Sequence, residues 1–456
     1  MKVNQYLELS EDGKTLIRCD ESAVGEVVIP DGVTVIGEKA FAFCEKFTSM
    51  KIASSVTKIG EGAFRRCTNL IMIKIPSSVT EIGEEAFDRC TNLTMIEIPS
   101  SATKIEAGAF IDCTSLTTIK IPSSVTEIGK KTFSGCTNLE SVKIPNSVTI
   151  IGDSAFSGCK SLESIKIPSS VTKIEAGAFI GCTSLASIEI PNSVTKIGRC
   201  AFKGCTSLTT IEIPSSVTEI EEGAFKGCTS LTSIEIPSSV TEIEEGAFEG
   251  CTSLTSIEIP NSVTKIEWCA FSGCTSLTSV EIPSSVTEIE AGAFEGCTSL
   301  KKFVVDVDNP NYCSFNGALF SKDMKTLIQV PLKIESFQIP NSVTAIWEWA
   351  FWGCTSITSV MIPKSVTIIG KWAFHGCTNL TSVVIPSSMT KIGSSAFSDC
   401  TSLKELHLRH KTPMDISKAF CWLDVSKITL YVPIGSGYDY RHHPFYSKFA
   451  KVLIEE

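Results

Sequence analysis

A unit of 23 residues recurs along most of this 456-residue chain, and it restricts the possible folds more than any other feature of the sequence. The stretch from Cys228 to Gly250 reads CTSLTSIEIPSSVTEIEEGAFEG, and Cys251 begins nearly the same stretch again. A unit this short cannot bury an apolar face alone, so repeated units stack and bury their inward rows against one another. The period therefore predicts one body of stacked turns, although the length alone would suggest two or three globular domains.

Each unit contains one short strand and one return segment. In the unit quoted above, Leu-x-x-Ile-x-Ile places alternate side chains inward, and Pro237 ends the strand because it cannot donate a ladder hydrogen bond. Val240 and Ile243 then bring the chain back along the opposite side, and Ala247 and Phe248 close the turn. The remaining residues leave no room for a long helix.

Cysteines occupy one position in nearly every unit. The chain has 20 cysteines, and one repeat position holds Cys44, Cys67, Cys90, Cys113, Cys136, Cys159, Cys182, Cys205, Cys228, Cys251, Cys274, Cys297, Cys354, Cys377 and Cys400. A position filled once per turn is typical of packing, so we expect buried free thiols. Pairing within the column stays geometrically conceivable, because neighbouring turns lie about 4.8 Å apart. Zinc is not expected, since the sequence has no CxxC motif and only 5 histidines.

Charge and hydropathy exclude several classes of function. The net charge of −10 argues against a general nucleic-acid surface or a surface for anionic membranes. No apolar run approaches the roughly 18 residues that span a bilayer. The N-terminal stretch MKVNQYLELSEDGKTLIRCD shows no apolar signal-peptide core, so we expect either an intracellular protein or a chain whose signal has been removed.

The turn motif A-F-x-x-C, which recurs from Phe41 to Cys400, completes the pattern L-x-x-I-x-I-P-x-x-V-x-x-I-x-x-x-A-F-x-x-C. This pattern resembles the BspA-like (Treponema pallidum type) leucine-rich repeats. The resemblance implies a right-handed solenoid with a parallel β-sheet on one face and extended or 3-10 segments on the other. Members of that family are mostly bacterial or protist surface proteins linked to adhesion and protein binding.

The period breaks once, between Cys297 and Cys354. Ser321 to Ile328 (SKDMKTLI) resembles Ser10 to Ile17 (SEDGKTLI), and both stretches predict hairpins around a polar turn. We expect the first to cap the core and the second to protrude from it as an island. The predicted organisation is an N-terminal capping hairpin at 1–30, repeats at 31–301, a β-hairpin island at 302–336, repeats at 337–408 and a C-terminal cap at 409–456.

The residue between the two isoleucines of each strand points away from the core, and this outward column changes character along the chain. It reads Lys51, Lys74, Glu97, Lys120, Lys143, Lys166, Glu189, Glu212, Glu235, Glu258, Glu281, Val304, Gln338, Met361, Val384 and His407. The column is therefore basic, then acidic, then largely apolar. On the return side, Lys58, Glu81, Lys104 and Glu127 alternate in sign, which predicts a ladder of ion pairs between turns.

The five stacked glutamates are the first candidate binding site. In water, each adjacent pair repels by roughly 0.9 kcal/mol, and the flanking Ser and Thr residues supply no counter-charge. Such a row should hold raised carboxyl pKa values, bind cations or meet a basic partner. The alternative is that recent duplication copied the glutamate along a solvated face.

Clustered tryptophans are the second candidate. Trp347, Trp349 and Trp352 lie in AIWEWAFWGC, and Trp372 lies one repeat later. The spacing predicts that Trp349 stacks on Trp372 and that Trp352 lies beside His375, exposed at the edge of the turns, as in many binding surfaces. The alternative is that these rings pack under the hairpin island.

No feature of the sequence predicts an enzyme. A repeated flat row of glutamates offers no cleft, and no phosphate-binding loop, GxSxG or HExxH motif occurs. We expect a non-catalytic, monomeric, cofactor-free protein-binding module, an adhesin at the cell surface or secreted, with a host or extracellular-matrix protein as ligand. The alternatives are a cytoplasmic or antigenically variable repeat scaffold, and weak calcium binding by the glutamates.

Overall fold

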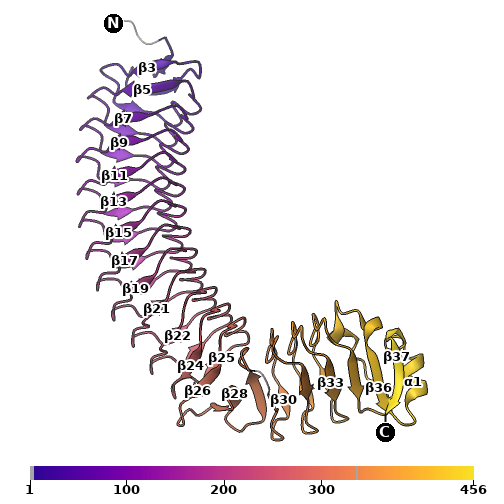
Figure 1. Ribbon diagram of the computed structural model, residues 1–456. Coiled ribbons are helices and arrows are strands. Elements are labelled where there is room, and N and C mark those ends of the chain that lie inside the picture. Colours follow the sequence, from indigo (N-terminus) through magenta and orange to yellow (C-terminus); the bar gives the residue numbers. More distant parts are fainter. Residues whose placement is uncertain (1–4, 335–336, 456) are drawn as a thin grey trace. The chain divides into compact units, whose positions relative to one another are not determined.

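The computed structural model describes residues 5–334 and 337–455, which divide into two compact units, Met1–Cys251 and Thr252–Glu456. Each unit is a stack of short strands in which every turn adds one rung to a parallel ladder (Figure 1). The predicted right-handed leucine-rich-repeat solenoid is confirmed. Two sides of each turn carry strands, which we call the sheet face and the return side.

The first unit contains two ladders, which are parallel except for the antiparallel pair of β1 and β2. Its sheet face consists of β3 (Gly25–Val28), β5 (Phe47–Lys51), β7 (Met72–Lys74), β9 (Met95–Glu97), β11 (Thr118–Lys120), β13 (Ser141–Lys143), β15 (Ser164–Lys166), β17 (Ser187–Glu189), β19 (Thr210–Glu212) and β21 (Ser233–Ile234). Its return side consists of β1 (Leu7–Leu9), β2 (Thr15–Cys19), β4 (Val35–Ile36), β6 (Lys58–Ile59), β8 (Glu81–Ile82), β10 (Lys104–Ile105), β12 (Glu127–Ile128), β14 (Ile150–Ile151), β16 (Lys173–Ile174), β18 (Lys196–Ile197), β20 (Glu219–Ile220) and β22 (Glu242–Ile243).

The second unit repeats this arrangement. Its sheet face contains β24 (Ser279–Ile282), β26 (Lys302–Val305), β31 (Ser359–Met361), β33 (Ser382–Ile385), β35 (Glu405–Leu408), β36 (Thr429–Pro433) and β37 (Lys451–Glu455). Its return side contains β23 (Lys265–Ile266), β25 (Glu288–Ile289), β27 (Tyr312–Phe315), β28 (Ala318–Ser321), β29 (Thr326–Gln329), β30 (Ala345–Ile346), β32 (Ile368–Ile369) and β34 (Lys391–Ile392). Helical turns occur near the C-terminus, at η1 (Ser417–Phe420), η2 (Val425–Lys427), α1 (Gly437–His442) and η3 (Tyr446–Lys448).

Identical side chains from successive turns form the core. The phenylalanine column stacks ring on ring, with centroids 5.0 Å apart between Phe64 and Phe87 and 5.5 Å apart between Phe156 and Phe179. Such offset stacks add attraction beyond the area they bury. Removal of one of these rings, for example Phe156, should therefore lower the free energy of unfolding by about 3–5 kcal/mol.

The cysteine column lies inside this core, and every thiol in it is buried and outside any disulfide. The Cys67 Sγ–H donates to the carbonyl of Phe41 at 3.1 Å, and Cys159 donates to Phe133 at 3.2 Å. The same bond recurs in most other turns, so the thiols satisfy buried carbonyl oxygens at the turn. Burial raises the pKa of Cys136 to about 12, which keeps this thiol protonated.

Hydroxyl groups connect successive turns where the strands end. Ser124 Oγ donates to the carbonyl of Ala102 at 2.6 Å, and Thr149 Oγ1 donates to that of Thr126 at 3.3 Å. Both kinds of bond recur at the equivalent Ser and Thr of other repeats. These side chains therefore donate to backbone carbonyl oxygens that the short strands of the return side do not pair.

Both predicted hairpins form. Strand β1 pairs antiparallel with β2, which continues in parallel to β4. Strand β28 pairs antiparallel with β27 and β29, and β29 continues in parallel to β30. Each hairpin thus provides the first rung for the parallel ladder that follows it.

The internal hairpin does not protrude, which differs from our expectation of an island. Leu319, Phe320 and Leu327 are fully buried. The Tyr312 hydroxyl accepts the Ile289 N–H at 2.9 Å and so ties the segment to the preceding turn. The polar turn motif predicts a hairpin but does not reveal that both of its faces are covered. Residues 335 and 336, at the end of the expected island, lie outside the described residues.

The C-terminal segment continues the sheet and then covers the last turn. β36 and β37 add two parallel strands to the ladder of β35. Tyr440 and Tyr446 are fully buried below them, and the Tyr446 hydroxyl donates to the carbonyl of Met414 at 2.7 Å. Large aromatic side chains thus take the place of the next repeat at this end of the core.

Candidate partner-binding surfaces

The sheet face of the first unit presents the predicted outward column. Glu189 of β17 lies opposite Glu212 of β19, and Lys166 of β15 lies opposite Glu189. These side chains are exposed, whereas the isoleucines on either side of each are buried, because successive residues of a strand point to opposite faces. The structure thus brings Glu189, Glu212 and Glu235 together on one surface.

An open groove of about 970 Å³ follows this part of the sheet face. Its lining includes the three glutamates, Lys166 and the strand-ending prolines Pro191, Pro214 and Pro237. None of the three glutamates forms an ion pair within the described residues of the chain. The groove therefore offers unneutralised carboxylates to a partner.

The other two predicted glutamates, Glu258 and Glu281, belong to the second unit, where both are exposed. Glu281 of β24 lies opposite Val304 of β26. The acidic character of the column therefore ends within this unit, as the sequence indicates.

Charges on the return side are arranged differently. Lys58 Nζ lies 3.1 Å from Glu81, and Lys196 Nζ lies 3.0 Å from Glu219, so ion pairs do link neighbouring turns there. Lys104, in contrast, pairs with Glu106 of its own turn. The predicted ladder is therefore confirmed in part. At this exposure each pair contributes about 0–1 kcal/mol.

The tryptophans form the predicted contacts but are less exposed than expected. Ring centroids are 5.0 Å apart between Trp349 and Trp372, and 6.1 Å apart between Trp352 and His375. All four tryptophans are half-buried. The His375 ring also lies 3.4 Å from the Asp399 carboxylate. The rings therefore present edges and partial faces at the turn, and not a fully solvated patch.

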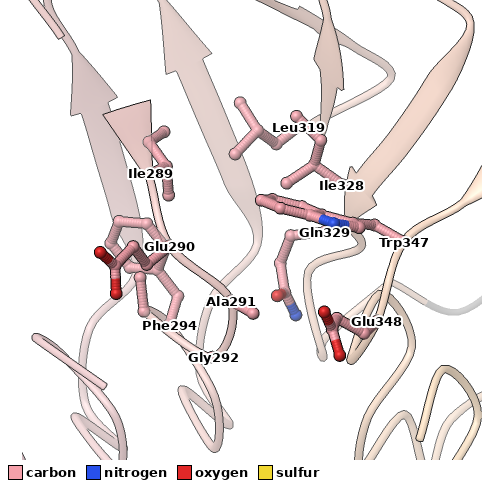
Figure 2. A pocket seen from close by; sticks show the side chains of 11 residues that line it. Ile289, Glu290, Ala291, Gly292, Phe294, Leu319, Ile328, Gln329, Trp347 and Glu348 are labelled. Carbon is pink, nitrogen blue, oxygen red and sulfur yellow. The ribbon is translucent and has the colours of Figure 1, made fainter. Parts of the chain in front are cut away.

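Trp347 packs against the internal hairpin, which is the alternative that we considered for these rings. Figure 2 shows its indole beside Ile328 and Gln329, with Glu290 and Phe294 across a small cavity of about 10 Å³. Its repeat position holds Gly or Glu in other turns. The larger ring fills space at the point where the period breaks, so Trp347 acts mainly in packing.

Two features near the C-terminus were not predicted from the sequence. Strands β36 and β37 extend the apolar end of the outward column with Tyr431 and Leu453, which follow His407 in register. His407 stacks on Tyr431 with centroids 4.4 Å apart. Trp422, at a turn, is 84% exposed. The repeat decays in this region, so only the alternation in TLYVP and KVLIE could have indicated the added strands.

The last strand is held by a charged cluster. Glu455 accepts a hydrogen bond from His407 at 2.8 Å and one from Arg409 at 3.0 Å. Although partial burial favours the neutral acid, these two partners together lower the pKa of Glu455. The charged form of Glu455 therefore fastens β37 to the sheet.

The described residues include no group of three His, Cys, Asp or Glu side chains arranged to hold a metal ion. Among the helices that the structure describes, none has both the length and the apolar character needed to span a bilayer.

The fold and the exposed sheet face define a leucine-rich-repeat protein, and comparison with known proteins gives the family. The model of the BspA-type leucine-rich-repeat region matches residues 19–140, 126–251, 218–331 and 325–436. The chain therefore belongs to the BspA-type leucine-rich-repeat family. Repeats of this family generally form non-enzymatic scaffolds for interaction with other molecules.

Two solved structures resemble this chain. A leucine-rich cell surface protein from Faecalibacterium prausnitzii is 31% identical, with a TM-score of 0.56, over 75% of this chain and 88% of that protein. A leucine-rich-repeat protein from Bacteroides ovatus is 28% identical, with a TM-score of 0.57, over 99% of this chain and 98% of that one. Among curated proteins, no sequence is significantly similar to this chain.

Proposed function

We propose that this chain is a non-catalytic adhesin-type module, at the cell surface or secreted, that binds a protein through its sheet face. The observation that carries the proposal is the row of Glu189, Glu212 and Glu235 in an open groove, where none of the three forms an ion pair among the described residues. Three carboxylates spaced by the parallel-strand distance favour a partner with a basic surface. The relative from Faecalibacterium prausnitzii is described as a cell surface protein, which supports this location.

The half-buried rings of Trp349, Trp352 and Trp372 form a second proposed contact. Partly exposed tryptophans that are fixed by their neighbours lose little conformational freedom on binding, and interface hot spots are enriched in them. We further propose that residues 1–30 and 409–456 close the ends of the repeat array. Segment 302–336 then joins the repeats of 31–301 to those of 337–408.

The test is binding of the full chain to a panel of immobilised extracellular-matrix and cell-surface proteins, measured by biolayer interferometry. The variant Glu189→Gln/Glu212→Gln/Glu235→Gln removes the carboxylates and keeps the shape of the side chains. The control variant Glu11→Gln/Glu127→Gln/Glu242→Gln removes the same charge from exposed positions off the sheet face. We expect saturable binding that the first variant loses and the control retains.

Two other outcomes are informative. If both variants bind like the parent and Trp349→Ala/Trp372→Ala does not, the contact surface is the tryptophan cluster and not the groove. If no protein of the panel binds saturably, the adhesin assignment fails, and the alternative of a scaffold without a single ligand gains support.

A further inference from the structure

Three consecutive lysines occupy the outward column just before the glutamates. Lys120, Lys143 and Lys166 lie on β11, β13 and β15, with Lys120 opposite Lys143 and Lys143 opposite Lys166. All three are exposed. In the part of the chain that the structure describes, none of them forms an ion pair. Earlier in the same column Lys74 pairs with Glu97 at 3.4 Å, so the uninterrupted run of unpaired lysines begins at Lys120.

These ammonium groups are unfavourably placed unless they meet an anion. At the parallel-strand spacing, each adjacent pair repels by roughly 0.9 kcal/mol in water before screening by salt. Return-side lysines such as Lys58 and Lys196 face carboxylates instead. A polyanion lying across the row would remove the repulsion and release its own counter-ions, which drives the binding of polyanions to lysine-rich surfaces.

Hydroxyl groups flank the lysines within each strand. Thr118, Ser141 and Ser164 are exposed, and they lie two residues before the three lysines on the same face of the sheet. Hydroxyls and ammonium groups both donate hydrogen bonds to the oxygens of a sulfate ester. Each of the three turns thus offers one charged and one neutral donor.

The width of the basic row restricts the shape of a ligand. Glu140 and Glu163 are exposed at the strand starts, and Glu189 follows Lys166 in the column. A broad anionic surface such as a membrane would meet these carboxylates at once. A short stretch of a thin linear polymer that runs across the strands, parallel to the stack, would meet the lysines and hydroxyls, and Glu97 and Glu189 at the two ends of the row would limit its length.

The surroundings also discriminate between kinds of linear polyanion. Single-stranded nucleic acids are held by base stacking on aromatic side chains as well as by charge. The aromatic rings of these turns, Phe133, Phe156 and Phe179, are fully buried. We propose that Lys120, Lys143 and Lys166 form a binding row for a linear sulfated polysaccharide. This row adjoins the proposed protein-binding groove and shares Lys166 with it, but the proposal does not depend on the function of that groove.

Calorimetric titration of the full chain with a heparin oligosaccharide, at several salt concentrations, tests the proposal. The variant Lys120→Gln/Lys143→Gln/Lys166→Gln should bind about tenfold more weakly, because three charge contacts are lost. Its dependence of log K on log salt should be shallower by about 2, at roughly 0.7 for each lost contact. The control Lys130→Gln/Lys160→Gln/Lys173→Gln has the same net charge but changes exposed lysines off the sheet face, and it should bind like the parent.

Circular dichroism should show that both triple variants keep the fold. Equal loss of affinity in the two variants, or no binding by the parent chain, would overturn the proposal. A single-stranded oligonucleotide of equal charge should bind more weakly than the heparin oligosaccharide. Equal binding of the two polymers would show a surface for polyanions in general and would reject the assignment to sulfated polysaccharides.

Discussion

The hairpin β1–β2 and the hairpin β28–β29 have the same turn, set in different surroundings. Ser10 Oγ donates to the Asp12 carboxylate at 2.6 Å, and Ser321 Oγ donates to Asp323 at 2.7 Å. The backbone N–H two residues after each aspartate donates to the same carboxylate, at 3.0 Å in both hairpins. Each hairpin also joins its following turn in the same way, through a threonine N–H that donates to the lysine carbonyl of the hairpin.

The difference lies on the face turned away from that following turn. Leu16 and Leu327 occupy equivalent core positions, and both are fully buried. The next residue is 47% exposed in the first hairpin, as Ile17, but only 7% exposed in the second, as Ile328. The exposed Glu8 corresponds to Leu319, which is fully buried. The internal hairpin has packed turns on both sides, whereas the first presents one side to solvent.

This comparison shows how a capping element becomes an internal rung. The hydrogen bonds of the turn define the hairpin, and the residues of the outer face decide whether another turn can cover it. A polar outer face is what keeps the end of a repeat array soluble. Four predictions test this separation, from the largest expected effect to the smallest.

Exchanging the outer-face residues should affect the two hairpins very differently. Leu319→Glu should lower the free energy of unfolding by about 5 kcal/mol, since it buries a carboxylate without a partner. The opposite change, Glu8→Leu, should alter it by less than about 0.5 kcal/mol, because the position is exposed. Urea unfolding followed by circular dichroism measures both values. Similar losses in the two variants would contradict the difference in burial.

Truncation of the inner-face residues should affect the two hairpins alike. Leu16→Ala and Leu327→Ala should each lower the free energy of unfolding by about 3 kcal/mol, because both side chains are fully buried in equivalent contacts. Thermal unfolding of the two variants under identical conditions gives the comparison. A loss at Leu327 alone would show that the first hairpin contributes little to the core.

The turn residue with left-handed backbone differs between the hairpins, with Gly13 at a φ of 70° and Met324 at a φ of 58°. Gly13→Ala should destabilise the protein by about 1 kcal/mol, because a Cβ atom is strained in this conformation. Met324→Gly should leave stability nearly unchanged, since relief of that strain is offset by the lost contact with Cys313. Thermal unfolding of the two variants would measure both effects. A clear gain for Met324→Gly would mean that the sulfur contact is unimportant.

Acid should loosen both turns in parallel. The serine hydroxyl, followed by a backbone N–H, lowers the pKa of Asp12 and likewise that of Asp323. A carboxylate whose pKa is lower in the folded state contributes stability above its unfolded pKa, and loses it as the pH falls through the folded value. Hydrogen exchange at the amides of Lys14 and Lys325 should therefore lose protection below about pH 4. Asp12→Asn and Asp323→Asn should each abolish this pH dependence at their own turn.

The repeat itself could be predicted because the same residue types face the same environment in every turn. Phe156, Cys159 and Ile165 each have an equivalent residue of the same or a similar type 23 residues before and after them in the chain. The contacts around the internal hairpin occur only once in the chain, so no other repeat indicates them. The burial of Leu319 and the packing of Trp347 depend on which turn covers the hairpin, and the hairpin motif carries no information on that contact.

For the candidate surfaces, the sequence predicts which side chains point outward or lie together, but not their surroundings. Alternation along a strand shows that Glu212 points outward. The structure adds that Glu212 lies in a groove and forms no ion pair among the described residues. The spacing of Trp349 and Trp372 predicts their contact, but not that the rings are half-buried. Neither Tyr431 nor Leu453 was identified, because the strands that hold them no longer follow the repeat.

The cysteine column makes the local opening of each turn measurable. A thiol that donates to a buried carbonyl of an earlier turn is inaccessible to an alkylating reagent until its own turn opens. The rate of alkylation at each cysteine therefore measures how often that turn opens. Since the thiols recur through the array, peptide-level mass spectrometry of one alkylated sample would locate the weakest turns, those next to the internal hairpin included.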